Sequence, residues 1–302
     1  MNSPQPLTRR EFLCGFSLLG LAAAAQPLSL PGGPGRPYQL GIYTRPWDQF
    51  DYRVALDGMV EAGFKYAGLM TAKGKADEIV SPDSSPEEIA QVAAEVQQRK
   101  LKTISIYGGA FPVAKSVADG IAGLKRLIDY ANVCGSPNLL LGGTTEPALV
   151  EPYYRVVAEC CDYAAAKGVG LTVKPHGGQN ATGPQCRRLI ERVNHKNLRL
   201  WYDPGNIFYY SNGALDPVDD CSSVDGLVVG MSVKDFKPPK EVLVTPGTGR
   251  VNFRAVMSRL KKGGFVQGPL VIECLDPGES PAKITAQAKK AREFVETLIY
   301  AG

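Results

Sequence analysis

The feature that most constrains the fold is a unit repeated along the chain: a short apolar run, a loop containing glycine, and an amphipathic stretch with helical periodicity. Eight apolar runs of this kind lie at residues 39–43, 66–70, 103–107, 138–141, 170–173, 198–202, 227–233 and 269–274. Their starts are roughly 30 to 40 residues apart, the length of one strand and one helix. The sequence therefore predicts an α/β fold, a single-domain (β/α)8 TIM barrel at residues 38–302.

The stretches between the runs carry ordinary helix signals. Helices are predicted at residues 51–62, 86–100, 117–133, 152–167, 184–193, 253–262 and 281–300. The clearest begins after Ser85, where a capping serine, Pro86 and Glu88 occupy the positions of a capping box. An open, doubly wound sheet is the alternative, but it usually carries a glycine-rich phosphate loop after its first strand, and residues 41–47 contain none.

The first 25 residues predict a secretory signal and not part of the fold. Arg9-Arg10 followed by Phe12-Leu13 is typical of a twin-arginine signal peptide, and small residues end the apolar run that follows. A membrane anchor is the alternative, but the run of about 14 residues is shorter than the 20 that a spanning helix needs. We therefore expect export to the periplasm or beyond, with residues 26–37, rich in Pro and Gly, as a flexible lead-in.

Charge and cysteine content exclude several classes of partner. Removing residues 1–25, which carry two arginines and one glutamate, lowers the formal charge from +4 to +3, which gives no electrostatic case for nucleic acid. No second long apolar stretch follows, so stable membrane insertion after cleavage is not expected. Six cysteines remain, in helix or strand patterns, and we interpret them as buried free thiols with no zinc-site spacing.

Polar side chains gather where the apolar runs end, and in an eight-stranded barrel the carboxyl ends of the strands form the active site. Hydroxyl, amide, cationic and aromatic groups of this kind suit a polyol. The predicted substrate-binding residues are Tyr43, Arg45, Tyr107, His176, Asn206 and Lys234. Three glycine pairs, at residues 108–109, 142–143 and 177–178, serve either tight turns or a close approach of ligand to the backbone.

Three charged residues lie inside otherwise apolar runs. Lys174 ends the fifth run, and its burial requires a carboxylate, for which Asp203 at the end of the sixth run is well placed. Glu273 follows Leu270-Val271-Ile272, where a site role or a structural salt bridge would explain it. His176 is expected to share a face with Lys174, with a structural role as its alternative. For Lys234 the alternative to a site role is a simple pairing with Asp235 beside it.

These patterns resemble the xylose isomerase-like TIM barrels, a superfamily of sugar phosphate isomerases and epimerases that includes endonuclease IV. The resemblance runs from about residue 39 to the C-terminus and is carried by Asp203-Pro204-Gly205-Asn206, Val233-Lys234-Asp235, residues 247–253 and Leu270-Val271-Ile272-Glu273. It implies a divalent metal held by Glu, Asp, His and Glu on strands five to eight, and proton transfer by two of the acids on a ketose.

Half of that implied ligand set is changed here. Asp203 and Glu273 match the acids of strands six and eight, but Lys174 stands at the strand-five Glu and Ser232 at the strand-seven His, while Asn206 replaces a further histidine. An ammonium at Lys174 would supply positive charge in place of the metal and repel a divalent cation. One Mn, Mg or Zn ion remains a less favoured alternative, with Asp203, Glu273 and His176 as its ligands. No nucleotide cofactor is expected.

Two functions remain open at the level of sequence. The first is an exported sugar isomerase or epimerase, or a lyase on an oxidised sugar, which acts by proton transfer next to a carbonyl with Lys174, Asp203 and Glu273 as catalytic residues. The second is a non-catalytic carbohydrate-binding barrel that has lost its metal site. Lys174 favours the first, because a lysine aimed at two retained carboxylates is typical of a rebuilt site. DNA repair is disfavoured by the presence of only two histidines, and a homo-oligomer is left open.

Overall fold

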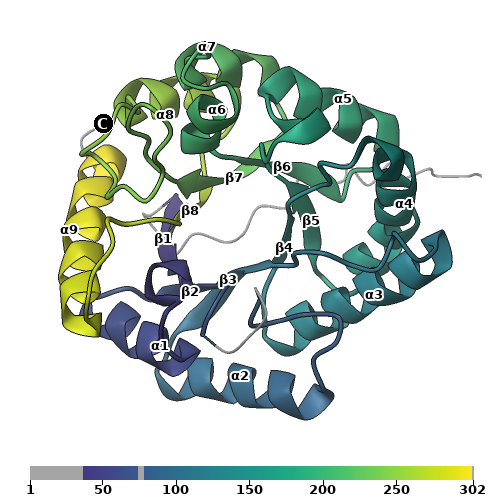
Figure 1. Ribbon diagram of the computed structural model, residues 1–302, viewed down its shortest axis with the longest axis horizontal. Helices are drawn as coiled ribbons and strands as arrows, with labels where there is room; N and C mark the ends of the chain where they lie inside the picture. Colours follow the sequence, from purple (N-terminus) through teal and green to yellow (C-terminus); the bar gives the residue numbers. More distant parts are fainter. Residues whose placement is uncertain (1–36, 74–77, 301–302) are drawn as a thin grey trace, which may run out of the picture.

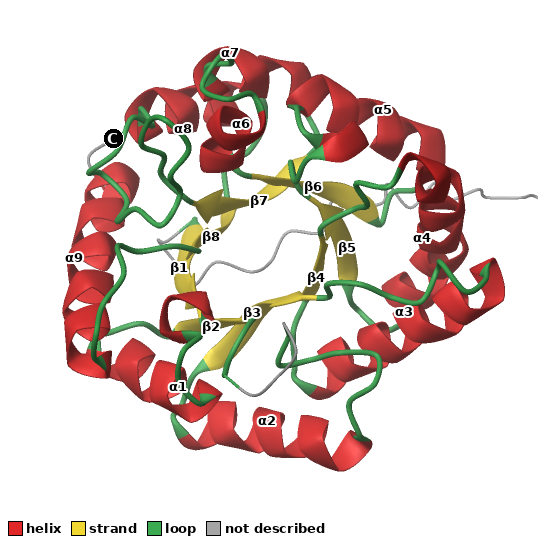
Figure 2. Ribbon diagram, viewed as in Figure 1, coloured by secondary structure: helices red, strands yellow, loops and turns green. Residues whose placement is uncertain are grey.

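The computed structural model describes residues 37–73 and 78–300 as a closed barrel of eight parallel strands surrounded by helices (Figures 1 and 2). Each strand pairs with the next in sequence, and β8 closes the ring on β1. The predicted (β/α)8 barrel is confirmed. The predicted signal peptide at residues 1–25 and the lead-in up to residue 36 lie outside the described residues.

The strands lie within one or two residues of the predicted positions. Their bounds are β1 Tyr38–Tyr43, β2 Tyr66–Leu69, β3 Lys102–Tyr107, β4 Asn138–Leu141, β5 Gly170–Val173, β6 Leu198–Tyr202, β7 Val228–Val233 and β8 Gly268–Ile272. All are parallel, so every carboxyl end opens on one face of the barrel.

The helices form the outer ring in Figure 2. Their bounds are α1 Tyr52–Glu61, α2 Pro86–Gln98, α3 Val117–Val133, α4 Val150–Ala166, α5 Gly183–Val193, α6 Pro204–Tyr210, α7 Pro217–Asp220, α8 Phe253–Lys262 and α9 Pro281–Tyr300. Ser85 and Glu88 form the predicted capping box at α2. Within the described residues no helix is long and apolar enough to cross a membrane.

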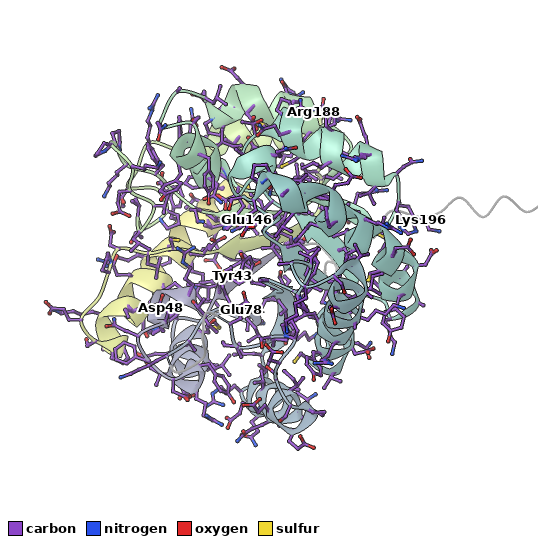
Figure 3. The ribbon with its side chains drawn as sticks, turned by 45° about the vertical axis from the view of Figure 1, so that its right-hand side comes forward. Tyr43, Asp48, Glu78, Glu146, Arg188 and Lys196 are labelled. Carbon is purple, nitrogen blue, oxygen red and sulfur yellow. The ribbon has the colours of Figure 1, made fainter. Side chains whose placement is uncertain are left out.

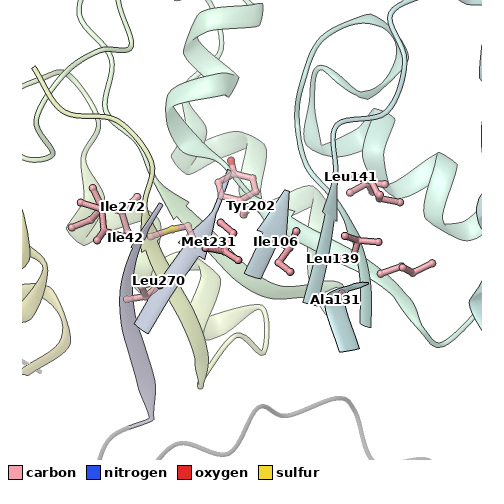
Figure 4. Close-up of a cluster of buried hydrophobic side chains, with 14 of the residues drawn as sticks. Ile42, Ile106, Ala131, Leu139, Leu141, Tyr202, Met231, Leu270 and Ile272 are labelled. Carbon is pink, nitrogen blue, oxygen red and sulfur yellow. The ribbon is translucent and has the colours of Figure 1, made fainter. Parts of the chain in front are cut away.

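Two apolar clusters follow from the alternation of side chains along each strand. Leu139 and Leu141 face outward into the large cluster between barrel and helices, part of which Figure 4 shows. Leu140 faces the barrel interior, where it joins a smaller cluster with Tyr43 and Trp201. The interior of the barrel is thus filled at mid-height, which leaves chemistry to the carboxyl ends of the strands.

Helices α6 and α7 were not predicted from the sequence. The pair Pro204-Gly205 is typical of a turn, but Pro204 is the first residue of α6, a position that proline's fixed φ favours, and Asp203 caps the helix. The Asp203 carboxylate accepts the backbone N–H of Asn206 at 2.9 Å. The acid is therefore held in one orientation by the start of the helix that follows its strand.

Candidate functional site

Glu273, the residue directly after β8, is the centre of a buried charge cluster. Its side chain is fully buried and is contacted by four donor groups. Oε1 lies 2.9 Å from Arg45 Nη1, 2.9 Å from Lys174 Nζ and 2.5 Å from Lys234 Nζ. Oε2 accepts from Lys174 Nζ at 2.8 Å and from the Ser232 hydroxyl at 2.7 Å. A carboxylate offers about four lone-pair positions, so Glu273 is saturated.

Asp203 is the second carboxylate of the cluster and is less heavily engaged. One oxygen accepts the Asn206 N–H, while Oδ2 lies 3.4 Å from Lys174 Nζ and 3.4 Å from Lys234 Nζ. Both distances exceed those of good charge-assisted hydrogen bonds, which are about 2.7–2.9 Å. Asp203 thus faces two ammonium groups without being tightly bonded to either.

Lys174 and Lys234 each bridge the two carboxylates, and their side chains are only 1% and 3% exposed. The prediction that Lys174 pairs with Asp203 is confirmed, but its shorter contacts are to Glu273. The suggested pairing of Lys234 with Asp235 is wrong. Asp235 instead accepts four backbone N–H groups, from Phe236, Gly247, Gly249 and Val251. It therefore anchors the loop between β7 and α8, which releases Lys234 for the site.

The pKa values of the cluster respond to burial and to the charges around each group. Burial alone would raise the pKa of Glu273, but Lys174, Lys234 and Arg45 hold it well below its usual range. For Asp203 burial prevails and the pKa is raised, although Lys234 and Lys174 oppose the shift. The pKa of Lys174 is lowered, chiefly by burial, with Glu273 opposing. Burial would also lower the pKa of Lys234, but Asp203 and Glu273 raise it.

Three half-buried rings lie beside the charged groups. The ring centroid of His176 lies 6.3 Å from that of Tyr107 and 5.8 Å from that of Tyr210, and Lys174 Nζ lies 5.9 Å from the Tyr107 centroid. Burial, followed by Lys174 and Lys234, lowers the pKa of His176 to about 3, so its imidazole is neutral at pH 7. We call Tyr107, His176 and Tyr210 the aromatic wall. Tyr210 was not among the predicted site residues; it is the last residue of the unpredicted helix α6.

Two predicted substrate-binding residues are engaged within the protein. Tyr43 is fully buried in the barrel interior and donates its hydroxyl to Ser105 Oγ at 2.9 Å, so it belongs to the core and not to the mouth. The Asn206 amide donates to the Pro175 carbonyl at 2.7 Å and accepts from Lys234 Nζ at 3.1 Å. Asn206 therefore ties β5, α6 and β7 together. Arg45 remains the accessible cation, with 32% of its side chain exposed.

The glycine pairs serve packing between protein groups. A Cβ on Gly142 would lie 2.7 Å from the Tyr107 hydroxyl and 3.2 Å from His176 Nδ1, and a Cβ on Gly177 would lie 2.7 Å from the Tyr210 ring. A Cβ on Gly143 would meet the Asn180 amide at 2.6 Å. At these positions the missing side chain makes room for the protein's own rings and amides, and the positive φ of Gly143 and Gly177 agrees with the tight turns given as one alternative.

The donor set does not fit a divalent metal ion. Among the described residues no group of three or more His, Cys, Asp and Glu side chains can hold one, so His176 does not complete a site with Asp203 and Glu273. The two carboxylates already face Lys174, Lys234 and Arg45, and a divalent cation there would be repelled by three like charges. The cations of the protein stand where the resemblance implied a metal.

The fold is a TIM barrel with a buried charge cluster at the carboxyl ends of its strands, and comparison with known proteins gives the family. A sequence model of the xylose isomerase-like TIM barrel matches residues 56–298. The chain belongs to this family.

Individual relatives are more distant. The chain is 31% identical over 147 residues to a probable L-ribulose-5-phosphate 3-epimerase of Mycoplasma pneumoniae, a match that covers 47% of this chain and 46% of that protein. The chain thus spans about half the length of this curated relative.

Solved structures share the fold over most of the chain. A D-allulose 3-epimerase from Methylomonas sp., in complex with D-allulose, superimposes with a TM-score of 0.67 at 20% identity, covering 87% of this chain and 97% of that one. A xylose isomerase domain protein from Planctomyces limnophilus gives a TM-score of 0.65 at 20% identity, with the same coverage of both chains. At this level of identity the likeness establishes the fold.

Proposed function

We propose that this protein is an enzyme that isomerises or epimerises a keto sugar by moving a proton next to the carbonyl group. The observation that carries the proposal is the cluster of two carboxylates and two lysines, buried together at the carboxyl ends of β5 to β8. Buried charges with opposed pKa shifts are typical of sites for proton transfer. The names of the related epimerases point to the same type of reaction.

Asp203 is the proposed base. Its pKa is raised by burial, and its contacts to the two lysines are the longest in the cluster, so it is poised to accept a proton. Glu273 is the weaker candidate, because four donors hold its pKa low. We therefore assign Glu273 to positioning the lysines, a revision of the catalytic role expected from the sequence.

Lys174 and Lys234 are the proposed oxyanion stabilisers. When Asp203 removes the proton from the carbon next to the carbonyl, the C–H bond breaks and the carbonyl oxygen becomes the oxygen of an enediolate. Two fixed ammonium groups in a water-poor site stabilise such charge without reorganisation. Return of this proton from Asp203 to the former carbonyl carbon, while the hydroxyl proton of the neighbouring carbon passes to the enediolate oxygen, gives an isomer. Donation of a proton by the Lys174 ammonium to the opposite face of the original carbon gives an epimer, and Asp203 then returns its proton to Lys174. Loss of a leaving group from the same intermediate would make the enzyme a lyase on an oxidised sugar.

The test is turnover on a panel of keto sugars, followed in both directions by chromatography. We expect conversion by the wild-type chain and a loss of at least 100-fold in kcat with Asp203→Asn, as for removal of a general base. Lys167→Met, which changes an exposed lysine paired with Asp129, is the control and should leave the rate unchanged. Equal rates for wild type and Asp203→Asn would refute the assignment of the base.

A non-catalytic sugar-binding barrel is the second candidate. It is favoured by the completeness of the cluster, in which Asp203, Glu273, Lys174 and Lys234 are at most 3% exposed and satisfy one another. A barrel of this kind would bind sugars across the panel, detected by calorimetry, without converting any of them.

We also propose export by the twin-arginine route to the periplasm or beyond. The support is the Arg9-Arg10 pair followed by an apolar run and small residues. Fractionation of cells that express the full chain should find a shortened protein outside the cytoplasm. Arg9→Lys with Arg10→Lys should retain the protein inside at full length, and an unchanged distribution would contradict the proposal.

A further inference from the structure

Arg45 carries a positive charge beyond the two that neutralise the buried carboxylates. Lys174 and Lys234 already balance Asp203 and Glu273, and each lysine contacts both carboxylates. Arg45 adds a third cation through its contact with Glu273, which leaves the five groups with one positive charge in excess. Asp48, the nearest acid in sequence, is exposed; its charge acts on Arg45, but the two described side chains form no ion pair.

Arg45 is also the member of the cluster that reaches the surface. Its side chain is 32% exposed, whereas the side chains of the other four are at most 3% exposed. It lies in the short 3-10 helix Arg45–Trp47 directly beyond β1, so its backbone is fixed at the mouth. A ligand that approaches the cluster therefore meets the guanidinium before it meets either lysine.

Within the described residues Arg45 uses only part of its hydrogen-bonding capacity. Only Nη1 donates to a described residue, at 2.9 Å to Glu273. A guanidinium has five N–H donors in a planar fork, and the edge formed by Nε and Nη2 matches the two oxygens of a carboxylate or phosphate. The side chain can thus keep its bond to Glu273 and still hold an oxyanion in bidentate fashion.

From this geometry we infer that Arg45 binds an oxyanion of the substrate, so that the sugar handled at this mouth carries a negatively charged group. The inference rests on the proposed function in that it places this group on the keto sugar. It sets the substrate class as an anionic sugar, with a carboxylate or a phosphate as the charged group. The half-buried rings of the aromatic wall lie beside the same cluster and can contact the apolar faces of the sugar.

The positive potential around His176 agrees with this assignment. After burial, the influences on its imidazole are Lys174 and Lys234, which lower the pKa, and Glu273, which raises it, followed by Arg45, which again lowers it. Three cations and one carboxylate thus act on a ring at the edge of the mouth.

Calorimetric binding with matched sugars tests the inference without requiring turnover. The probes are a neutral hexulose, the corresponding hexuronate carrying a keto group, and the hexulose phosphate. We expect at least one of the two anions to bind tenfold or more tightly than the neutral sugar, and the comparison between them identifies the charged group. Arg45→Gln should remove that preference and leave the affinity for the neutral sugar within twofold of wild type.

Two further variants control for loss of charge and for loss of fold. Arg188→Gln, on the outside of α5 (Figure 3), makes the same change away from the mouth and should leave all affinities unchanged. Arg45→Lys keeps the charge but loses the fork, and should retain part of the preference for the anion. The thermal unfolding of each variant shows whether it is folded.

The outcomes separate this inference from the proposed function. Equal affinity of the wild-type chain for neutral and anionic sugars, or no binding at all, would overturn the inference. An equal loss of affinity for all probes in Arg45→Gln would also overturn it, since Arg45 would then act only through Glu273. Preferential binding of anions without turnover would support Arg45 as an oxyanion site and refute the proposed enzyme. Turnover of a keto sugar without any preference for anions would support the proposed enzyme and refute Arg45 as an oxyanion site.

Discussion

Replacement of Lys174 by methionine tests how the buried charges are shared. Methionine has a similar length, so the change removes the ammonium and leaves little empty space. Three contacts are lost, at 2.8 and 2.9 Å to Glu273 and at 3.4 Å to Asp203. Breaking a buried ion pair typically costs about 3–5 kcal/mol, because it leaves one charge without a partner.

Here neither carboxylate would be left alone. Glu273 keeps Arg45, Lys234 and Ser232, and Asp203 keeps Lys234 and a backbone N–H, so the remaining charges balance. We therefore expect Lys174→Met to lower the free energy of unfolding by only about 1–3 kcal/mol, the cost of leaving a hydrogen-bonded group incompletely satisfied. For a chain of this size that corresponds to a fall in Tm of about 2–4 °C per kcal/mol.

The assay is urea denaturation followed by circular dichroism, with thermal unfolding as a second measure. Lys167→Met is the matched control, because Lys167 pairs with Asp129 at 2.8 Å with both side chains 40% exposed. A surface pair of this kind is worth about 0–1 kcal/mol. A cost for Lys174→Met no larger than that of the control would refute the buried pairing. A cost above about 5 kcal/mol would refute the compensation by Lys234 and Arg45.

Three further predictions concern the same network. Because burial raises the pKa of Asp203, the acid limb of kcat/KM should lie above the value of about 3.9 for an unperturbed aspartate; a limb below that value would point to Glu273 as the base. Asp235→Ala removes the acceptor of four backbone N–H groups and should cost about 3 kcal/mol or more in urea denaturation, whereas a cost below 1 kcal/mol would contradict its anchoring role. Lys174→Glu combined with Ser232→His should gain one divalent metal per chain, measured by elemental analysis, and the wild-type chain should carry none; a chelator-sensitive stoichiometric metal in the wild-type chain would refute the replacement of a metal by protein cations.

The burial of the cysteines was predictable from their positions in the sequence. All six after residue 25 are buried and free in the structure, as their positions within helix and strand patterns predicted. Burial raises the pKa of several of these thiols, including Cys134 and Cys161, to about 12. A thiol that remains protonated is a poor nucleophile, so these cysteines serve packing.

The barrel was predictable because a short apolar run followed by a turn marks each strand in the sequence. The position of Asp203, Lys174 and Glu273 at strand ends followed from the same pattern, because parallel strands bring their carboxyl ends together. Their convergence on one cluster is confirmed by the structure.

The other features of the site depend on which side chains meet in the folded chain, and spacing along the sequence does not determine this. No spacing indicates that Lys234 reaches Glu273 while its neighbour Asp235 turns away to the loop. Tyr210 was missed because α6 is short and begins at a Pro-Gly pair that reads as a turn. Tyr43 was misassigned because a residue that ends a strand can still face the filled interior of the barrel.

The exchange of solvent deuterium into a sugar is the most direct test of the central claim, which is proton transfer next to a carbonyl at this cluster. The wild-type chain, treated with a chelator and incubated in D2O with its preferred keto sugar, should place deuterium on the carbon next to the carbonyl, detected by NMR. Asp203→Asn should abolish this exchange while retaining sugar binding. Exchange that persists in Asp203→Asn would contradict the account, because Asp203 is the proposed base.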